Sequence, residues 1–475
     1  MKFEEIKIIY FLGIGGIGMS ALARFFLLQE KEVHGYDLTP TEITSQLMGE
    51  GAHIHFEEDI HKIPKQVDAV VFTPAVPKEH KEYCYFREHH IPLLKRSEVL
   101  GIICSGYPTI AIAGTHGKTT TTAMVTQMMC NSEWQPEINH PKILSFIGGI
   151  AKNFNSNFVY MPGFDTVVAE ADEFDRSFLT LHPQVAVITS MDADHLDIYG
   201  NVENMRESFQ LFANQIQPDG TLIIYDEIAN QIAHPRKITY GFSEQAQYKI
   251  SNIQYFPTKT IFELTYRVPL SLKTSLKWES HSGIPFVLHI QGKHNVLNAV
   301  AAFAASLEFL IWKNSQFSNF QSLITSLSKF TGVSRRFDVR IQRPDFVYID
   351  DYAHHPAEIR AFLDAVKKSY PDKKITGIFQ PHLYSRTRDF AREFADALEV
   401  LDEIILLDIY PAREEPLEGI TSEYLLSLIH HKNKTLLSKE NILSHLQQKR
   451  PNVLLTMGAG DIDKLIQDSR LLSFI

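Results

Sequence analysis

Glycines at positions 13, 15 and 18 follow the pattern G-x-G-x-x-G between an apolar run and a helical pattern. Glycines at this spacing let the backbone approach a pyrophosphate, and the helix that follows aims amide donors at it. Asp37 ends the next apolar run, where a carboxylate can accept hydrogen bonds from ribose hydroxyls. The pattern predicts a site for a nucleoside diphosphate, which UDP or NAD would satisfy. A tight strand–helix turn without ligand is the alternative.

A second glycine-rich loop, Gly114-Thr-His-Gly117-Lys118-Thr119-Thr-Thr, follows the apolar run at residues 109–113. A phosphate-binding loop needs a flexible backbone, a lysine for the phosphates and a hydroxyl for Mg²⁺, and all three occur here in order. The strict G-x-x-x-x-G-K-[ST] pattern fails because Ile112 stands where its first glycine should be. The sequence therefore indicates a shortened variant of the ATP-binding loop.

Two acidic segments follow the expected strand ends of the same region. The first is Glu170-Ala-Asp-Glu-Phe-Asp, and the second, Asp192-Ala-Asp-His-Leu-Asp, contains His195. Carboxylates at such positions can hold Mg²⁺ against nucleotide phosphates, because hard cations prefer oxygen ligands. Either segment alone could be a solvated turn. Two of them after a phosphate loop favour a metal–nucleotide site.

One pyrophosphate loop together with one ATP loop predicts two nucleotides, one carrying the substrate and one supplying energy. This pairing favours a ligase. An NAD-dependent oxidoreductase would use the first loop only and would leave Lys118 and both acidic segments without a task. A nucleotide-binding protein without activity would be expected to have lost Lys118, Glu170 or His195, which are all present.

The elements that must position these residues alternate between strands and helices. Strands at residues 6–12, 32–36 and 69–73 and a helix at 19–29 predict a parallel sheet covered by helices. A second block is predicted from strands at 109–113, 166–169 and 185–189, followed by strands expected to be antiparallel at 221–225, 248–256 and 260–268. A helix at 295–310 and a hinge at 330–337 precede a third α/β block. Its predicted strands are 347–349, 375–379, 403–407 and 452–457, and its predicted helices are 356–369, 389–400 and 462–468.

The bulk properties restrict the class of protein. The chain has 475 residues, 44% of them hydrophobic, and a net charge of −10, which favours a soluble globular protein and disfavours nucleic acid as a partner. Its 3 cysteines are too widely spaced for a disulfide framework. Glu4, Glu5 and the first glycines do not suit a secretory signal, and no apolar run is long enough for a membrane span. A cytoplasmic location is expected.

Eight segments in order carry a resemblance to the Mur ligase family, and the chain is similar to that family over essentially its whole length. They are residues 13–20, 114–121, 170–173, 194–200, 294–299, 334–337, 350–356 and 380–387. The resemblance implies an α/β fold of three domains: a Rossmann-like UDP-sugar domain at 1–107, a central P-loop ATPase domain with a mixed sheet at 108–333, and a Rossmann-like amino-acid domain at 334–475.

The resemblance is to the branch of this family that joins L-alanine to UDP-N-acetylmuramate during peptidoglycan precursor synthesis. It implies that ATP phosphorylates the lactyl carboxylate and that the amine of L-alanine then attacks the acyl phosphate. Two Mg²⁺ ions are expected, for which Mn²⁺ can substitute. Positioning and charge neutralisation would carry this chemistry.

The resemblance also assigns roles by position. Lys118, Glu170 and His195 are the expected catalytic residues, and the metal ligands would be Thr119, Glu170 and His195. The expected UDP-sugar residues are Gly13, Gly15, Gly16, Ile17, Gly18, Asp37 and Thr73. The expected ATP residues are Gly114, Thr115, His116, Gly117, Lys118, Thr119, Thr120, Asn295, Arg336 and Asp351. The expected amino-acid residues are Tyr352, His354, His382 and Arg386.

Two departures from the family pattern affect these assignments. Several members hold the second metal with a carbamoylated lysine, but no lysine lies between His195 and Lys237, so that device is not expected here. Leu383 stands where many members of the branch have arginine, which leaves L-serine or glycine as alternative substrates. A related ligase that attaches a tripeptide is the nearest alternative activity.

Overall fold

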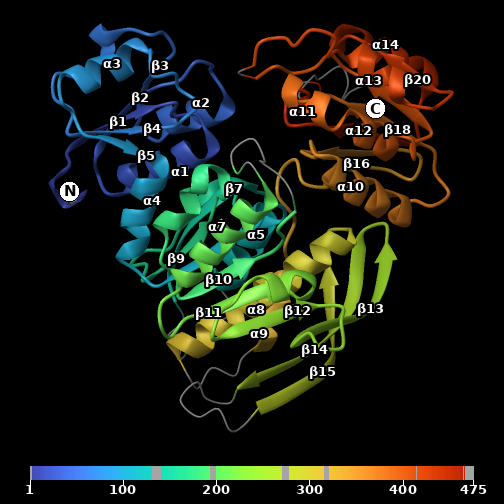
Figure 1. Ribbon diagram of the computed structural model, residues 1–475, viewed down its shortest axis with the longest axis horizontal. Coiled ribbons are helices and arrows are strands. Elements are labelled where there is room, and N and C mark those ends of the chain that lie inside the picture. Colours follow the sequence, from blue (N-terminus) through green and yellow to red (C-terminus); the bar gives the residue numbers. More distant parts are fainter. Residues whose placement is uncertain are drawn as a thin grey trace. The chain divides into compact units, whose positions relative to one another are not determined.

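The computed structural model describes residues 3–130, 141–192, 199, 201–269, 278–314, 320–412, 414–463 and 465. Their strands form three sheets, each with its own helices (Figure 1). The chain divides into two compact units. The first comprises Met1–Asn252, Phe262–Phe286 and Leu297–Phe330, and the second comprises Ile253–Ile261, Val287–Val296 and Thr331–Ile475.

The first sheet has five strands in the order β3-β2-β1-β4-β5, and its neighbouring strands run parallel. The strands are β1 (Ile8–Leu12), β2 (Glu32–Tyr36), β3 (His53–His55), β4 (Ala69–Phe72) and β5 (Leu93–Lys95). The helices are α1 (Ile17–Leu28), α2 (Glu42–Gly49), α3 (Lys81–Glu88) and α4 (Arg96–Ser105). The predicted Rossmann-like parallel sheet is confirmed, and β1 is nearly all buried, as expected for a central parallel strand.

The second sheet has ten strands in the order β15-β14-β13-β12-β11-β10-β6-β9-β7-β8. The first six in chain order are β6 (Thr109–Ala113), β7 (Ile143–Ala151), β8 (Ser156–Tyr160), β9 (Thr166–Glu170), β10 (Val185–Ile188) and β11 (Thr221–Tyr225). The others are β12 (Lys237–Gly241), β13 (Tyr248–Phe256), β14 (Lys259–Pro269) and β15 (Trp278–Leu288). The helices of this block are α5 (Lys118–Met129), α7 (Val202–Asn214), α8 (Lys293–Lys313) and α9 (Phe320–Ser328).

The expected antiparallel pairing after residue 220 is wrong for β11, which pairs in parallel with both β10 and β12. β13 also meets β12 in parallel, at Tyr240 and Tyr248. The reason is burial: four of the five β11 residues are buried, and a continuous apolar run suits a parallel strand covered on both faces. Antiparallel pairing is present between β7 and β8, so the sheet is mixed, as expected for the central domain.

The third sheet has six strands in the order β16-β17-β21-β18-β19-β20. They are β16 (Asp338–Gln342), β17 (Val347–Asp351), β18 (Ile375–Phe379), β19 (Glu403–Leu406), β20 (Lys434–Leu436) and β21 (Val453–Met457). Only the β16–β17 pair is antiparallel among the pairings described for this sheet. The helices are α10 (Pro356–Ser369), α11 (Tyr384–Asp389), α12 (Ala391–Leu398), α13 (Ser422–Leu428) and α14 (Lys439–Lys449).

Two helix predictions for this block need comment. The helix expected at 389–400 is α12, which starts later than predicted. Phe390 separates α11 from α12 because its backbone is not helical, with a φ of −119° and a ψ of 19°. Most of the helix expected at 462–468 lies outside the described residues. The helix expected at 295–310 is confirmed as α8, which is long and apolar enough to cross a membrane. Its apolar window is 89% buried inside the protein, which is typical of a core helix.

Candidate active site

The first glycine loop is shaped by close contacts that leave no room for side chains. Gly13 has a φ of +83°, and a Cβ there would lie 2.7 Å from the Thr73 side chain. The amide of Gly15 donates a hydrogen bond to Asp37 Oδ2 at 2.7 Å. The structure therefore brings Gly13, Gly15, Asp37 and Thr73 together at the start of α1, where Ile17 is the first helical residue. Backbone amides at such a helix start suit an anionic ligand.

The second glycine loop joins β6 to α5. Gly114 and Gly117 have φ values of +132° and +84°, which residues other than glycine rarely adopt. Two residues after β10 support the loop from outside: Thr189 donates to the Ala113 carbonyl at 3.1 Å, and Ser190 Oγ accepts from the His116 amide at 2.8 Å.

The other predicted loop residues hold the same structure together. Thr115 Oγ1 lies 2.9 Å from Ser190 Oγ, and Thr120 is buried within α5. The loop is therefore held in a fixed shape by side chains that follow the neighbouring strand β10.

Lys118 is the first residue of α5 and is held by both the loop and an acidic side chain. Its ammonium donates to the Gly114 carbonyl at 2.7 Å and to Glu173 Oε1 at 2.9 Å. Burial alone would lower the pKa of Lys118, but the carboxylates of Glu173, Asp172 and Glu170 raise it above its usual value. The lysine therefore stays charged, as a phosphate ligand must.

Thr119 and Glu170 form an oxygen-rich pair beside Lys118. Thr119 Oγ1 donates to Glu170 Oε1 at 3.2 Å, and the Gly148 amide donates to Glu170 Oε2 at 2.9 Å. Burial raises the pKa of Glu170, and Lys118 opposes that rise. The hydroxyl of Thr119 and the carboxylate of Glu170 offer oxygen ligands, which fit a hard divalent cation such as Mg²⁺. The third expected ligand, His195, lies outside the described residues.

Strand order explains why these residues meet. β9 lies beside β6 in parallel, with Glu170 paired to Ile112, so the acidic segment leaves the sheet next to the phosphate loop. Carboxyl ends of neighbouring parallel strands share one edge of the sheet, which is where ligands of open α/β sheets bind.

One cavity is lined by both the first glycine loop and the acidic segment that begins at Glu170. Its volume is about 270 Å³, and its lining includes Gly16, Gly18 and Thr73 from the block of the first sheet together with Gly148 and Glu170 from the block of the second sheet. The same lining includes Ile17, Arg96 and Asp172. The Arg96 guanidinium at the start of α4 forms an ion pair with Asp172, so a cation and an anion lie on the cavity wall. Burial would raise the pKa of Asp172, but Arg96 and Lys118 hold it below its usual value.

The four expected amino-acid residues lie close together in the third sheet's block. The ring of His354 lies 5.2 Å from the ring of Tyr352 and 6.1 Å from that of His382. Burial, with a smaller effect of Arg386, lowers the pKa of His354 to about 4, so its imidazole is neutral at pH 7. Arg386 lies on α11. The grouping offers the guanidinium of Arg386 and the neutral imidazole of His354.

Three of the predicted ATP residues also lie in the second compact unit. Asp351 accepts hydrogen bonds from the amides of Phe337 and Ala353, both at 2.7 Å, and burial raises its pKa to about 7. The Arg336 guanidinium lies 5.1 Å from the centre of the Tyr352 ring. Asn295 donates to the Gln291 carbonyl at 2.7 Å. Asp351 thus supports the turn that carries Arg336.

Three residues that lie at the cavity or against the phosphate loop were not predicted from the sequence. Arg96 and Gly148 carry no local motif, and only the tertiary structure places them at the cavity. Asn298 lies so close to Gly117 that a Cβ there would be 2.4 Å from Asn298 Oδ1. Its signal is present in the sequence, because it follows Asn295 by three positions on a helix and therefore shares its face.

Three family models match the chain in order. Residues 8–108 match the catalytic domain of the Mur ligase family, residues 112–306 match the Mur ligase middle domain, and residues 335–460 match the Mur ligase glutamate ligase domain. Together they span nearly the whole chain.

Individual relatives agree with these models. A UDP-N-acetylmuramate–L-alanine ligase of Flavobacterium psychrophilum is 44% identical over 471 residues, which cover 98% of each chain. One of Cytophaga hutchinsonii is 42% identical over 482 residues, covering 99% of this chain and 98% of the relative. The crystal structure of UDP-N-acetylmuramate–alanine ligase MurC from Thermotoga maritima superposes with a TM-score of 0.78 at 28% identity, covering 99% and 98% of the two chains. This chain therefore belongs to the Mur ligase family.

Proposed function

We propose that the protein is an ATP-dependent ligase that joins L-alanine to the lactyl carboxylate of UDP-N-acetylmuramate in peptidoglycan precursor synthesis. Such an enzyme works in the cytoplasm, where its nucleotide substrates are found. The similarity over full length to ligases that bear this name supports the substrate pair. The family assignment supports the use of ATP.

The observation that carries the proposal is a cavity lined by both the first glycine loop and Glu170, a hydrogen-bond partner of the phosphate loop. An enzyme that phosphorylates a UDP-sugar must bring the sugar carboxylate to the terminal phosphate of ATP. Its lining includes Gly16, Ile17 and Gly18 of the predicted pyrophosphate loop, and also Glu170, which accepts a hydrogen bond from Thr119 of the phosphate loop. A dehydrogenase would need no such connection.

The chain's own residues supply positioning and charge. Lys118 would hold the phosphates of ATP, and Thr119 and Glu170 would hold Mg²⁺ through oxygen ligands, with His195 as a further ligand. The metal would neutralise charge on the transferred phosphoryl group. Arg96 would hold an anionic group of the UDP-sugar on the cavity wall, because its guanidinium lines that wall.

The bond changes are those of acyl activation. A lactyl carboxylate oxygen attacks the terminal phosphorus of ATP, the bond to ADP breaks, and an acyl phosphate forms. The neutral amine of L-alanine then attacks the acyl carbon, phosphate leaves, and the amine loses a proton. Arg386 would pair with the carboxylate of L-alanine, since a guanidinium can bind it in a bidentate manner. Tyr352, His354 and His382 would line the remainder of that site.

The direct test is phosphate release from ATP with Mg²⁺ and UDP-N-acetylmuramate, with L-alanine, L-serine, glycine or the cell-wall tripeptide added separately. Turnover should require both the UDP-sugar and L-alanine. Turnover with the tripeptide and not with any of the single amino acids would reassign the protein to the related ligase that attaches a tripeptide. Equal turnover with L-serine or glycine would show that Leu383 broadens the choice of amino acid. No turnover with any acceptor would refute the ligase assignment.

A further inference from the structure

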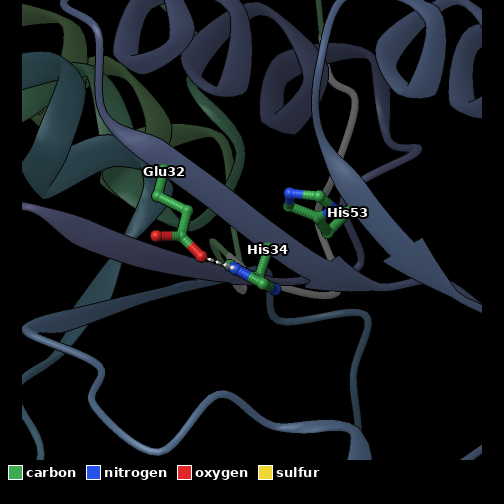
Figure 2. A group of neighbouring side chains, drawn as sticks. All are labelled: Glu32, His34 and His53. Carbon is green, nitrogen blue, oxygen red and sulfur yellow. Dashed lines mark hydrogen bonds and ion pairs between the residues drawn. The ribbon is translucent and has the colours of Figure 1, made fainter.

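A group of side chains of types that can ligate a metal ion lies on the first sheet, outside the lining of the cavity described above. β2 presents Glu32 and His34 on one face, because residues two apart on a strand point the same way. His53 is the first residue of β3, which forms the edge of the sheet. In the parallel register, His53 is the direct partner of His34. Figure 2 shows the three side chains gathered over the two neighbouring strands.

The three side chains lie close to one another. Glu32 Oε1 lies 2.7 Å from His34 Nε2, and the rings of His34 and His53 stack with their centres 4.8 Å apart. One ligand atom from each residue can be chosen so that all lie within 4.8 Å of one another. Ligand atoms on a tetrahedral zinc ion lie roughly 3.3 Å apart, given metal–nitrogen distances of about 2.0–2.1 Å. Small side-chain rotations would close that difference.

The backbone of the sheet holds these three residues next to one another. The three residues lie on two hydrogen-bonded strands, so their Cα positions are fixed by the sheet. His34 is half-buried, with 17% of its side chain exposed, which restricts its rotamers. Glu32 and His53 are exposed, so an ion can reach them from solvent.

We propose that Glu32, His34 and His53 form a binding site for a divalent transition-metal ion of the zinc type. Two imidazoles and one carboxylate suit zinc, cobalt or nickel, and a set with two nitrogen ligands disfavours magnesium. Three protein ligands leave a position for water or for a group from another molecule. The site is therefore chemically distinct from the oxygen ligands Thr119 and Glu170.

Metal binding here has a structural consequence for the first domain. The ion would join the short edge strand β3 to β2, which continues to Asp37 at the first glycine loop. An ion that binds only the folded protein raises its stability by mass action. Bound metal should therefore raise the unfolding temperature of the wild-type protein.

The test uses the full-length protein, freed of metal with chelator and kept in excess Mg²⁺ to occupy oxygen-ligand sites. Zn²⁺ binding is measured by calorimetry, and Co²⁺ binding is followed by its visible absorption. One equivalent of Zn²⁺ should bind to the wild type and raise its unfolding temperature. In the His34→Ala/His53→Ala variant the Kd should rise by at least about tenfold, and the temperature shift should disappear.

Two further variants keep the test decisive. Glu32→Gln changes an exposed side chain and should weaken Zn²⁺ binding without affecting the fold. His89→Ala/His90→Ala removes two adjacent exposed histidines of the same domain and should bind Zn²⁺ like the wild type. Equal Zn²⁺ affinity of the wild type and the His34→Ala/His53→Ala variant would overturn the proposal, as would the absence of Zn²⁺ binding to the wild type.

Discussion

Lys118 and Glu173 form an ion pair in which the ammonium lies 2.7 Å from Glu173 Oε2, with only 13% and 1% of the two side chains exposed. The lysine of the phosphate loop is therefore charged and held in place by a residue of the acidic segment after β9. This ion pair links the predicted phosphate loop to the predicted metal-binding segment.

Loss of Lys118 should stop catalysis while sparing the UDP-sugar site. Lys118→Ala is expected to lower turnover by roughly 10²–10³-fold or more, because a positive charge at the transferred phosphate is lost. The Kd for UDP-N-acetylmuramate, measured by calorimetry, should stay within about twofold, since the pyrophosphate loop is a different segment. Lys142→Ala, an exposed lysine of the same domain, is the control. Wild-type turnover in Lys118→Ala would remove the phosphate loop from the mechanism.

The buried ion pair should also show as energetic coupling. Lys118→Met alone leaves the buried Glu173 charge without its partner and should lower the free energy of unfolding by roughly 3–5 kcal/mol. Adding Glu173→Gln should recover most of that loss, because it removes the uncompensated charge. The four proteins of the double-mutant cycle are compared by urea denaturation. Purely additive effects of the two substitutions would contradict a coupled pair.

Arg96 should act on the UDP-sugar rather than on ATP. It lines the shared cavity beside Gly18, where a Cβ would lie 3.2 Å from its guanidinium. Arg96→Ala is expected to raise the KM for UDP-N-acetylmuramate by about tenfold or more, the effect of losing a charged hydrogen-bond donor. The KM for ATP should change by less than about twofold. The exposed Arg87→Ala serves as control, and an unchanged KM for the UDP-sugar in Arg96→Ala would exclude the contact.

Glu308 predicts how stability depends on pH. It is 2% exposed, accepts a hydrogen bond from Tyr248 at 2.8 Å, and burial raises its pKa from 4.5 to about 7. Between pH 4.5 and about 7, the folded protein keeps the proton on Glu308 while the unfolded chain loses it. The stabilisation is therefore fully present below pH 4.5 and is lost as the pH rises through about 7.

Glu308→Gln removes that titration and should be more stable than the wild type at pH 8, by up to roughly 3 kcal/mol. The difference should become small at about pH 5, where the wild-type carboxyl keeps its proton. Unfolding by urea at both pH values measures it, and Glu207→Gln on the exposed side of α7 should show no such trend. A variant that loses stability equally at both pH values would contradict a buried, protonated Glu308.

The sequence was a good guide wherever the signal is local. The two glycine loops lie between strand and helix as predicted, because their spacing demands turns that only glycine allows. Buried apolar runs such as β6 were placed almost to the residue. Segments whose partners lie far along the chain were harder to predict. β11 was expected to pair antiparallel, although burial of four of its five residues suits a parallel strand. Which strands become its partners depends on segments elsewhere in the chain.

The candidate site shows the same limit. Thr119 and Glu170 are 51 positions apart, and they meet only because β6 and β9 become neighbours. Arg96 and Asp172 are 76 positions apart on different domains, so no motif could connect them. Motifs therefore predicted candidate chemical groups, whereas strand order determined which of them lie close together.

The proposed activation of the UDP-sugar carboxylate by ATP passes through an acyl phosphate. UDP-N-acetylmuramate labelled with oxygen-18 in the lactyl carboxylate tests it most directly. After turnover with L-alanine, mass spectrometry of the released phosphate should show one labelled oxygen per molecule, transferred through the acyl phosphate. Amide product formed together with unlabelled phosphate would contradict the account.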